Sequence, residues 1–239
     1  MKRFSLLLSA AFLCVVCALL PVCATTEGTC QLCEKSVTWA GLSTIADDAT
    51  TISAGHYIYD YSEDSHTWSA TKTISGTVCI QIPEGKTLCG ITQLFCVPKN
   101  TALNIQGDGT LIAGGFAEGT TWTSRNGGIL QVSAGGSVHI YGCSYKVALA
   151  NTTALKPYNG GLIYNLGTVN IHGGTFTGSS VGGVGSAIFA GPSSALNFYS
   201  GNITGNTPAV CAQGTISLNG DPQISQIQLR YKSGSPTHG

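Results

Sequence analysis

Two cysteines near the start of the chain have the spacing of a metal-binding pair. Cys30 and Cys33 are separated by two residues, and two thiolates at this spacing can hold one metal ion such as zinc. A closed zinc site needs four ligands, and no second Cys-x-x-Cys motif or histidine pair follows nearby in the sequence. Two other interpretations stay open: a disulfide between these cysteines, or a bond that tethers one of them to another cysteine.

The cysteine count alone does not give the pairing. Seven cysteines follow residue 24: Cys30, Cys33, Cys79, Cys89, Cys96, Cys143 and Cys211. An odd number in an exported chain leaves at least one thiol unpaired or bound outside the chain. Export permits disulfides, whereas an anaerobic habitat would keep the thiols reduced.

The carboxylates are too few, and lie too early in the chain, to favour chemistry on a sugar. A glycosidase needs two facing carboxyl groups, and a calcium-assisted lyase needs several around one cation. Of the 11 carboxylates, only Asp221 lies after residue 118. Glu63, Asp64 and His66 could hold a cation, but their setting favours a solvated polar loop over residues 62–69. An enzyme is therefore the less favoured interpretation.

No nucleophile is paired with a base in this sequence. His139 and Cys143 are four residues apart, but the repeat described next places His139 on a strand and Cys143 at a corner. A thiolate–imidazole pair needs hydrogen-bond contact. The glycine pairs are followed neither by a helix nor by the Lys-Ser/Thr ending of a phosphate-binding loop. We therefore expect no catalytic residue and no cofactor.

Any site must be positioned by short strands that recur along the chain. Five units open with triplets at residues 95–97, 130–132, 163–165, 188–190 and 210–212, and second triplets follow at 103–105, 138–140, 169–171, 196–198 and 216–218. The step between the two triplets is always even, which keeps the same side chains facing inward. A third apolar position follows in each unit, at Leu111, Tyr145, Phe176, Ile203 and Ile224. Three strand signals per unit predict an all-β fold, a parallel β-solenoid with three faces and about six to seven coils.

The outward positions of this repeat form two columns. The first contains Asn104, His139, Asn170, Asn197 and Ser217, and the second contains Gln106, Tyr141, His172, Tyr199 and Asn219. With coils about 4.8 Å apart, Tyr141, His172 and Tyr199 would form an aromatic line beside amide side chains. Rings and amides suit a neutral glycan. The simpler alternative is that these side chains stack on one another as strand exteriors do.

An earlier coil is expected over residues 71–90. Val78, Ile80 and Ile82 alternate inward there, which turns Cys79 to the opposite face. The stretch 57–61 is expected to form the first strand or an N-terminal cap.

The chain divides into four parts. Residues 1–24, with Lys2 and Arg3 before an apolar run, have the pattern of a signal peptide. Residues 25–54 form a polar lead-in with the Cys-x-x-Cys motif, residues 55–230 form the repeat domain, and residues 231–239 form a polar tail. The longest excursions from the repeat are residues 114–126 and 146–160. After the signal peptide no further hydrophobic stretch is long enough to span a membrane.

The glycine-rich segments 160–165 and 167–176 resemble the repeat of pectin-lyase-like, right-handed parallel β-helix surface proteins of Gram-positive gut bacteria. Segments 37–39, 54–57 and 73–76 are similar to the lead-in of such proteins. The resemblance spans residues 36–230 and implies a right-handed, single-stranded parallel β-helix. It further implies a secreted or surface-displayed, adhesin-like protein. Polysaccharide lyases and glycosidases share this fold.

The charge composition limits the classes of binding partner that we expect. Without the signal peptide the chain keeps all 11 carboxylates and nine basic residues, for a formal charge of −2. Nucleic acid is not expected as a partner, since it needs clustered Lys and Arg. We expect a secreted or cell-surface, non-catalytic module for adhesion or recognition of neutral glycans or of host or cell-surface components. The alternatives are a carbohydrate-active enzyme and a purely structural spacer.

Overall fold

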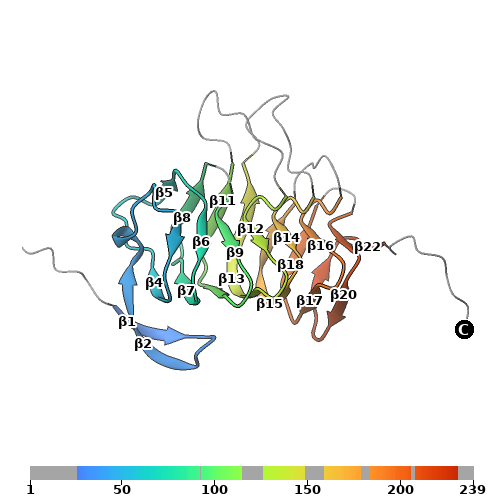
Figure 1. Ribbon diagram of the computed structural model, residues 1–239, viewed down its shortest axis with the longest axis horizontal. Coiled ribbons are helices and arrows are strands. Elements are labelled where there is room, and N and C mark those ends of the chain that lie inside the picture. The colour runs from blue at the N-terminus through green and yellow to red at the C-terminus, as the bar shows by residue number, and fades with distance from the viewer. Residues whose placement is uncertain are drawn as a thin grey trace, which may run out of the picture.

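The computed structural model describes residues 26–91, 93–114, 126–148, 159–178, 184–205 and 208–230. Among these residues the one helical element is the short 3-10 helix η2 (Leu42–Thr44), and all other regular structure is strand. The strands lie side by side along the long axis of the molecule, in an order that follows the chain from blue to red (Figure 1). The fold is thus mostly β, as the sequence predicts.

Three parallel ladders run along this axis. The first ladder comprises β4 (Gly55–Ile58), β7 (Thr77–Gln81), β10 (Ala102–Gln106), the starts of β13 (Ser137–Val147) and β15 (Thr168–Thr177), β17 (Ala195–Phe198) and β20 (Thr215–Leu218). The second comprises β5 (Ser65–Trp68), β8 (Thr87–Gly90), β11 (Thr110–Ala113), the ends of β13 and β15, β18 (Asn202–Thr204) and β21 (Gln223–Ile224). The third comprises β3 (Thr51–Ile52), β6 (Lys72–Ile74), β9 (Phe95–Val97), β12 (Leu130–Val132), β14 (Ile163–Asn165), β16 (Ile188–Ala190), β19 (Val210–Ala212) and β22 (Ile227–Leu229). From β3 onward the chain visits the three ladders in turn.

The predicted register is confirmed in all three ladders. In the third ladder the first triplets pair residue for residue, Leu130 with both Phe95 and Ile163. In the first ladder Val138 pairs with Leu103 and with Val169. The third apolar positions likewise pair in the second ladder. The even spacing therefore identified the inward side chains correctly.

Two details differ from the sequence-based expectation. Residues 62–69 are not a polar loop throughout, because Ser65–Trp68 forms β5 and pairs with β8. Trp68 is fully buried there and donates its indole N–H to the Tyr61 hydroxyl at 2.9 Å. The alternating pattern of residues 57–61 predicts a strand there. The observed strand, β4, covers Gly55–Ile58 and therefore includes only the first two of these residues. Residues 1–24, 231–239 and most of the excursions 114–126 and 146–160 lie outside the described residues.

One hydrophobic core fills the space between the ladders. Its members are the inward aliphatic and aromatic side chains of all three ladders, almost all fully buried. Tyr145 and Phe176 stack inside the second ladder with ring centroids 4.5 Å apart. Each fully buried large apolar side chain contributes about 1.5–3 kcal/mol before the conformational entropy lost on ordering the chain is subtracted.

A buried lysine fixes the segment before β3. Lys72 Nζ donates to the carbonyl oxygens of Ala46, Asp47 and Ala49 at 2.6–2.9 Å. Its ammonium also lies 5.0 Å from the centre of the Trp68 ring. Burial lowers the pKa of Lys72, and the three carbonyls offset part of the cost of removing its charge from water.

A hairpin precedes the ladders. β1 (Thr26–Cys30) pairs antiparallel with β2 (Lys35–Gly41) across a turn at residues 31–34. The end of β2 pairs parallel with β4, where Ala40 is opposite Tyr57. The polar lead-in thus contains three strands, β1 to β3. The hairpin stands at the N-terminal end of the molecule, at lower left in Figure 1.

Replacing an inward residue tests this arrangement. We expect Ile163→Asp to lower the free energy of unfolding by roughly 3–5 kcal/mol, because it places an unpaired charge between the fully buried neighbours Leu130 and Ile188. The outward control Asn170→Ser should cost only about 1 kcal/mol, the value of a side-chain hydrogen bond. Chemical denaturation followed by circular dichroism measures both. Equal stabilities of the two variants would contradict the assignment of faces.

Candidate functional site

The outer surface of the first ladder carries one column of polar side chains. Strand pairing places these residues on successive strands, each opposite the next: His56, Cys79, Asn104, His139, Asn170, Asn197 and Ser217. The turn of the β1–β2 hairpin covers the first three members, and the rest lie beyond it. The column therefore has a covered part and an open part, which differ in chemistry.

An aromatic stack lies beside the open part. The rings of Tyr141 and His172 have centroids 4.4 Å apart and are inclined by 5°. His172 and Tyr199 follow at 4.5 Å and 7°. A shift in register after Ile140, where Tyr141 pairs with Gly173, accompanies this alignment. The predicted aromatic line is confirmed.

The stack presents edges rather than faces to the outside. Because the three rings lie parallel at van der Waals separation, His172 covers one face of Tyr141 and one face of Tyr199. Tyr199 is 41% exposed and ends the stack, since the next position in its column is Asn219, directly after β20. A ligand therefore meets ring edges and tyrosine hydroxyls along the stack, and the exposed part of Tyr199 at its end. Burial raises the pKa of Tyr141, which keeps its hydroxyl a donor at neutral pH.

The amides of the open part bond to one another along the ladder. Asn197 Nδ2 donates to Asn170 Oδ1 at 2.9 Å, and Asn170 Nδ2 lies 3.4 Å from His139 Nε2. Among the described residues, His139 Nδ1 and His172 Nε2 are buried nitrogens without a hydrogen-bond partner. Burial lowers the pKa of both histidines, and His172 lowers that of His139 further. Both rings are therefore neutral at pH 7 and can donate or accept.

Asn104 does not belong to this open surface. The sequence placed it with Asn170 and Asn197 as a ligand-binding residue, but its side chain is fully buried. Its amide lies 3.6 Å from Cys30 Sγ because the hairpin turn packs over β10. A ligand on the outer face does not reach it.

Under the hairpin turn, three thiols and an imidazole converge. One ligand atom each from Cys30, Cys33, His56 and Cys79 lies within 4.8 Å of all the others. Cys30 Sγ and Cys79 Sγ are 3.3 Å apart, and Cys33 Sγ and His56 Nε2 are 3.4 Å apart. Among the described residues this is the one cluster with the ligand types and spacing of a metal site.

Local structure explains why the four groups meet. The hairpin turn brings Cys30 and Cys33 to one side, and the parallel pairing of β4 with β7 sets His56 opposite Cys79. Trp39, fully buried, packs edge-on against the His56 ring at 5.5 Å. Together with Cys30 and Cys79 it forms a small cluster on the outer face, separate from the main core.

The surroundings of Cys30 favour its thiolate form. Burial raises the pKa of Cys30, but hydrogen bonds from the backbone and side chain of Cys33 and from the Cys79 thiol outweigh burial, so the net pKa is lowered. For Cys33 and Cys79 burial and the neighbouring Cys30 raise the pKa.

The sequence identified half of this cluster. Cys30 and Cys33 stood out by their spacing, whereas His56 and Cys79 lie 23 and 46 residues beyond Cys33 and were not predicted as ligands. The alternation of Val78 and Ile80 already indicated that Cys79 points outward, and this feature could have identified Cys79 as a candidate ligand. No feature of the sequence around His56 indicated a ligand.

The remaining candidates for catalysis do not form a site. Cys143 Sγ donates to the carbonyl oxygen of Gln106 at 3.5 Å, and burial raises its pKa to about 12, so its thiol is a structural donor. The His66 side chain, on β5, is only 15% exposed and lies 2.7 Å from Asp47 and 3.2 Å from Glu63. Asp64 pairs with Lys86 instead, so the trio Glu63, Asp64 and His66 does not converge on one point.

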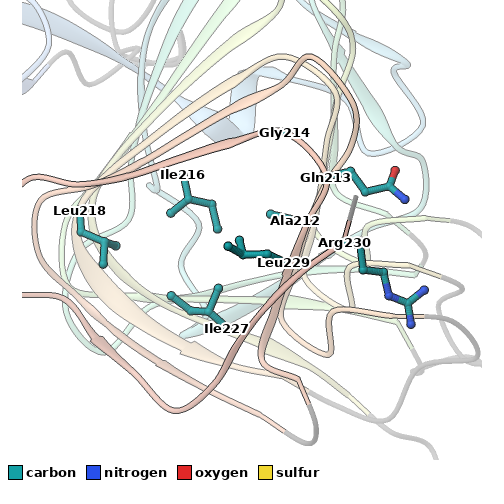
Figure 2. A pocket seen from close by; sticks show the side chains of 8 residues that line it. All are labelled: Ala212, Gln213, Gly214, Ile216, Leu218, Ile227, Leu229 and Arg230. Atoms are coloured by element: carbon teal, nitrogen blue, oxygen red, sulfur yellow. The ribbon is translucent and has the colours of Figure 1, made fainter. Parts of the chain in front are cut away.

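A hollow of about 460 Å³ lies at the C-terminal end of the ladders. Figure 2 shows Ile216, Leu218, Ile227 and Leu229 converging in it, with Arg230 to one side. Its lining comes from the last described strands, β20 and β22, and from the residues next to them. Within the described residues the hollow therefore lies where the three ladders end.

Comparison of the chain with protein-family models, with curated proteins and with solved structures finds no match. The function must therefore be argued from the surface itself. In the described part of the chain, none of the helices has the length and apolar character to cross a membrane.

The two stacked histidines should make stability sensitive to mild acid. Their pKa values are lowered in the folded state, so the unfolded chain binds protons first as the pH falls through about 6.5. Stability is then complete at neutral pH and decreases below it. The variants His139→Asn and His172→Tyr introduce residues found at neighbouring positions of the same columns. Between about pH 7.5 and 5.5, the melting temperature of each variant should decrease less than that of the parent chain.

Thermal denaturation at several pH values measures this difference. Tyr141→Phe, which removes no group that titrates in this range, is the control. Identical pH profiles of all four proteins would show that neither histidine is responsible.

Proposed function

We propose that this chain is a secreted or surface-displayed, right-handed parallel β-helix that recognises carbohydrate without cleaving it. The observation that carries the proposal is the stack of Tyr141, His172 and Tyr199 beside the hydrogen-bonded amides of Asn170 and Asn197. The ligand class is a neutral glycan of the cell surface or of a host.

The course of the chain supports the helical winding. Successive strands visit the first, second and third ladders in turn, and each ladder is parallel throughout. A chain wound about one axis produces this order, and parallel neighbours joined by crossovers are right-handed in nearly all proteins. The glycine-rich repeat at residues 160–176 supports the same winding through its resemblance to β-helix surface proteins.

The chemistry of the open surface suits a sugar. Tyr199 is 41% exposed at the end of the stack, and an apolar sugar face can pack against its ring. The tyrosine hydroxyls and the partly exposed amides of Asn170 and Asn197 offer donors and acceptors to sugar hydroxyl groups. The formal charge of −2 after signal removal gives no reason to expect an anionic ligand.

The distribution of carboxylates supports recognition rather than cleavage. Asp221 lies beside the end of the stack, where its backbone N–H donates to the Tyr199 carbonyl oxygen at 3.2 Å, but it is the only carboxylate after residue 118, so the coils that carry the stack supply no facing pair of their own. Sugar hydrolysis and calcium-assisted elimination both require carboxylates at the bound bond. The proposal therefore assigns binding to this face and no turnover.

A glycan screen with residues 25–239 tests the proposal, scoring both retention and release of reducing or unsaturated sugar. We expect retention without release. Tyr199→Ala should weaken retention by about 10–100-fold, the effect of losing roughly 1.4–2.7 kcal/mol of ring contact. Tyr199→Phe, which keeps the ring and removes the hydroxyl, should retain most of the binding.

The double variant Tyr141→Ala with Tyr199→Ala should abolish retention while its circular dichroism spectrum stays that of the parent chain. Tyr164→Ala, an aromatic replacement on the third ladder, is the control for the surface. Release of sugar by the parent chain would favour an enzyme. No retention on any glycan would remove the proposal and leave a structural spacer.

A further inference from the structure

We infer that Cys30, Cys33, His56 and Cys79 form a structural zinc site that fastens the N-terminal hairpin to the outer face of the first ladder. The inference is independent of carbohydrate binding, because it concerns the covered part of the column. It rests on the convergence of the four groups.

The geometry is close to that of a tetrahedral ion. With Zn–S bonds of about 2.3 Å and a Zn–N bond of about 2.0 Å, neighbouring ligand atoms in such a site are about 3.5–3.8 Å apart. Two opposite edges of the tetrahedron formed by the four ligand atoms have measured lengths. Cys30 Sγ and Cys79 Sγ are 3.3 Å apart, and Cys33 Sγ and His56 Nε2 are 3.4 Å apart. All other separations are at most 4.8 Å. Side-chain movements of about an ångström complete the tetrahedron.

The ligand set and its enclosure specify the kind of metal site. Three thiolates and one imidazole are a common structural set for zinc, and they leave no position for water or substrate. Cys30 and Cys79 are fully or almost fully buried, whereas Cys33 and His56 are half-buried at the rim. Zinc binding releases the protons of the coordinating thiols and leaves the oxidation state of sulfur unchanged.

A second layer of contacts holds the ligands in place. Asn104 Nδ2 lies 3.6 Å from Cys30 Sγ and can donate to it. Gln106 Oε1 accepts from the backbone N–H of Gln31 at 2.9 Å, and Gln106 Nε2 donates to the carbonyl oxygen of Thr29 at 3.0 Å. Such outer contacts orient metal ligands in known sites. They also explain why two buried amides lie under a hairpin turn.

The site would supply an attachment that strand pairing provides only weakly. β1 pairs with β2 alone, and β2 joins the first ladder through two residue pairs with β4. Zinc would connect the hairpin turn directly to β4 and β7, closing loops of 23 to 49 residues between its ligands. The hairpin would then cap the covered part of the column.

A disulfide between Cys30 and Cys79 is the competing arrangement. Their sulfur atoms are close enough to be joined by a small movement. A disulfide uses two of the four groups, however, and gives no reason for Cys33 and His56 to face each other at the same point. The convergence of all four favours the ion.

Metal analysis of residues 25–239, purified under reducing conditions and supplied with zinc, tests the inference. We expect about one zinc ion per chain after desalting. Cobalt in its place should give the intense visible bands of a tetrahedral ion together with thiolate-to-cobalt charge-transfer bands. Chelation of the zinc should lower the melting temperature and expose the hairpin to proteolysis.

Variants separate the ligands from the other cysteines. His56→Gln and Cys79→Ser should each weaken zinc binding by more than the roughly 10–100-fold cost of losing an outer contact, which Asn104→Ala should show. Cys96→Ser, on the third ladder, is the matched control and should bind zinc as the parent chain does. Because His56 is half-buried, His56→Gln should fold even if Cys79→Ser does not.

Three results would overturn the inference. The first is zinc content well below one equivalent in the folded parent chain under reducing conditions. The second is a Cys30–Cys79 disulfide in that same preparation, found by mass spectrometry after alkylation without reduction. The third is recovery of another metal, such as iron, in preference to zinc.

Discussion

The structure depends on the burial of inward side chains in exact register along three parallel ladders. Leu130, Ile163, Ile188 and Val210 are fully buried neighbours in the third ladder, and equivalent sets run along the other two. Strand side chains alternate between faces, so a slip by one residue would move a whole set into water. Fixing the inward set therefore fixes the outward column from His56 to Ser217, while the register shift after Ile140 adjusts the position of Tyr141.

This register produces a single outer column with two environments. The hairpin buries Cys79 and Asn104 and partly covers His56, whereas His139, Asn170 and Asn197 remain beside an open aromatic stack. Buried thiols and an imidazole suit a metal ion, while half-exposed amides and rings suit a neutral hydrogen-bonding ligand. The same strand pairing thus supports two different chemistries, and the position of the hairpin separates them.

The spacing of parallel strands also limits what the aromatic stack can do. Neighbouring strands are about 4.8 Å apart, and rings carried at equivalent positions relax to 4.4–4.5 Å. At that separation each ring covers its neighbour, which stabilises the surface but removes the faces of inner rings from contact with a ligand. Tyr199 stays 41% exposed at the end of the stack, because the next position in that column is Asn219 rather than another ring.

The sequence by itself determined the repeated strands and their faces. The first triplets coincide with β9, β12, β14, β16 and β19 residue for residue, because period-two alternation and even spacing are local properties. It also identified the aromatic line and the Cys-x-x-Cys pair, but placed residues 65–68 in a loop, since β5 is formed by pairing with β8 rather than by its own alternation. Only the tertiary structure decided that the hairpin folds back over β7 and β10. That docking depends on the packing of Trp39 and on contacts between residues up to 77 positions apart, which no local pattern in the chain encodes. The burial of Asn104 and the meeting of Cys30 and Cys33 with His56 and Cys79 follow from it.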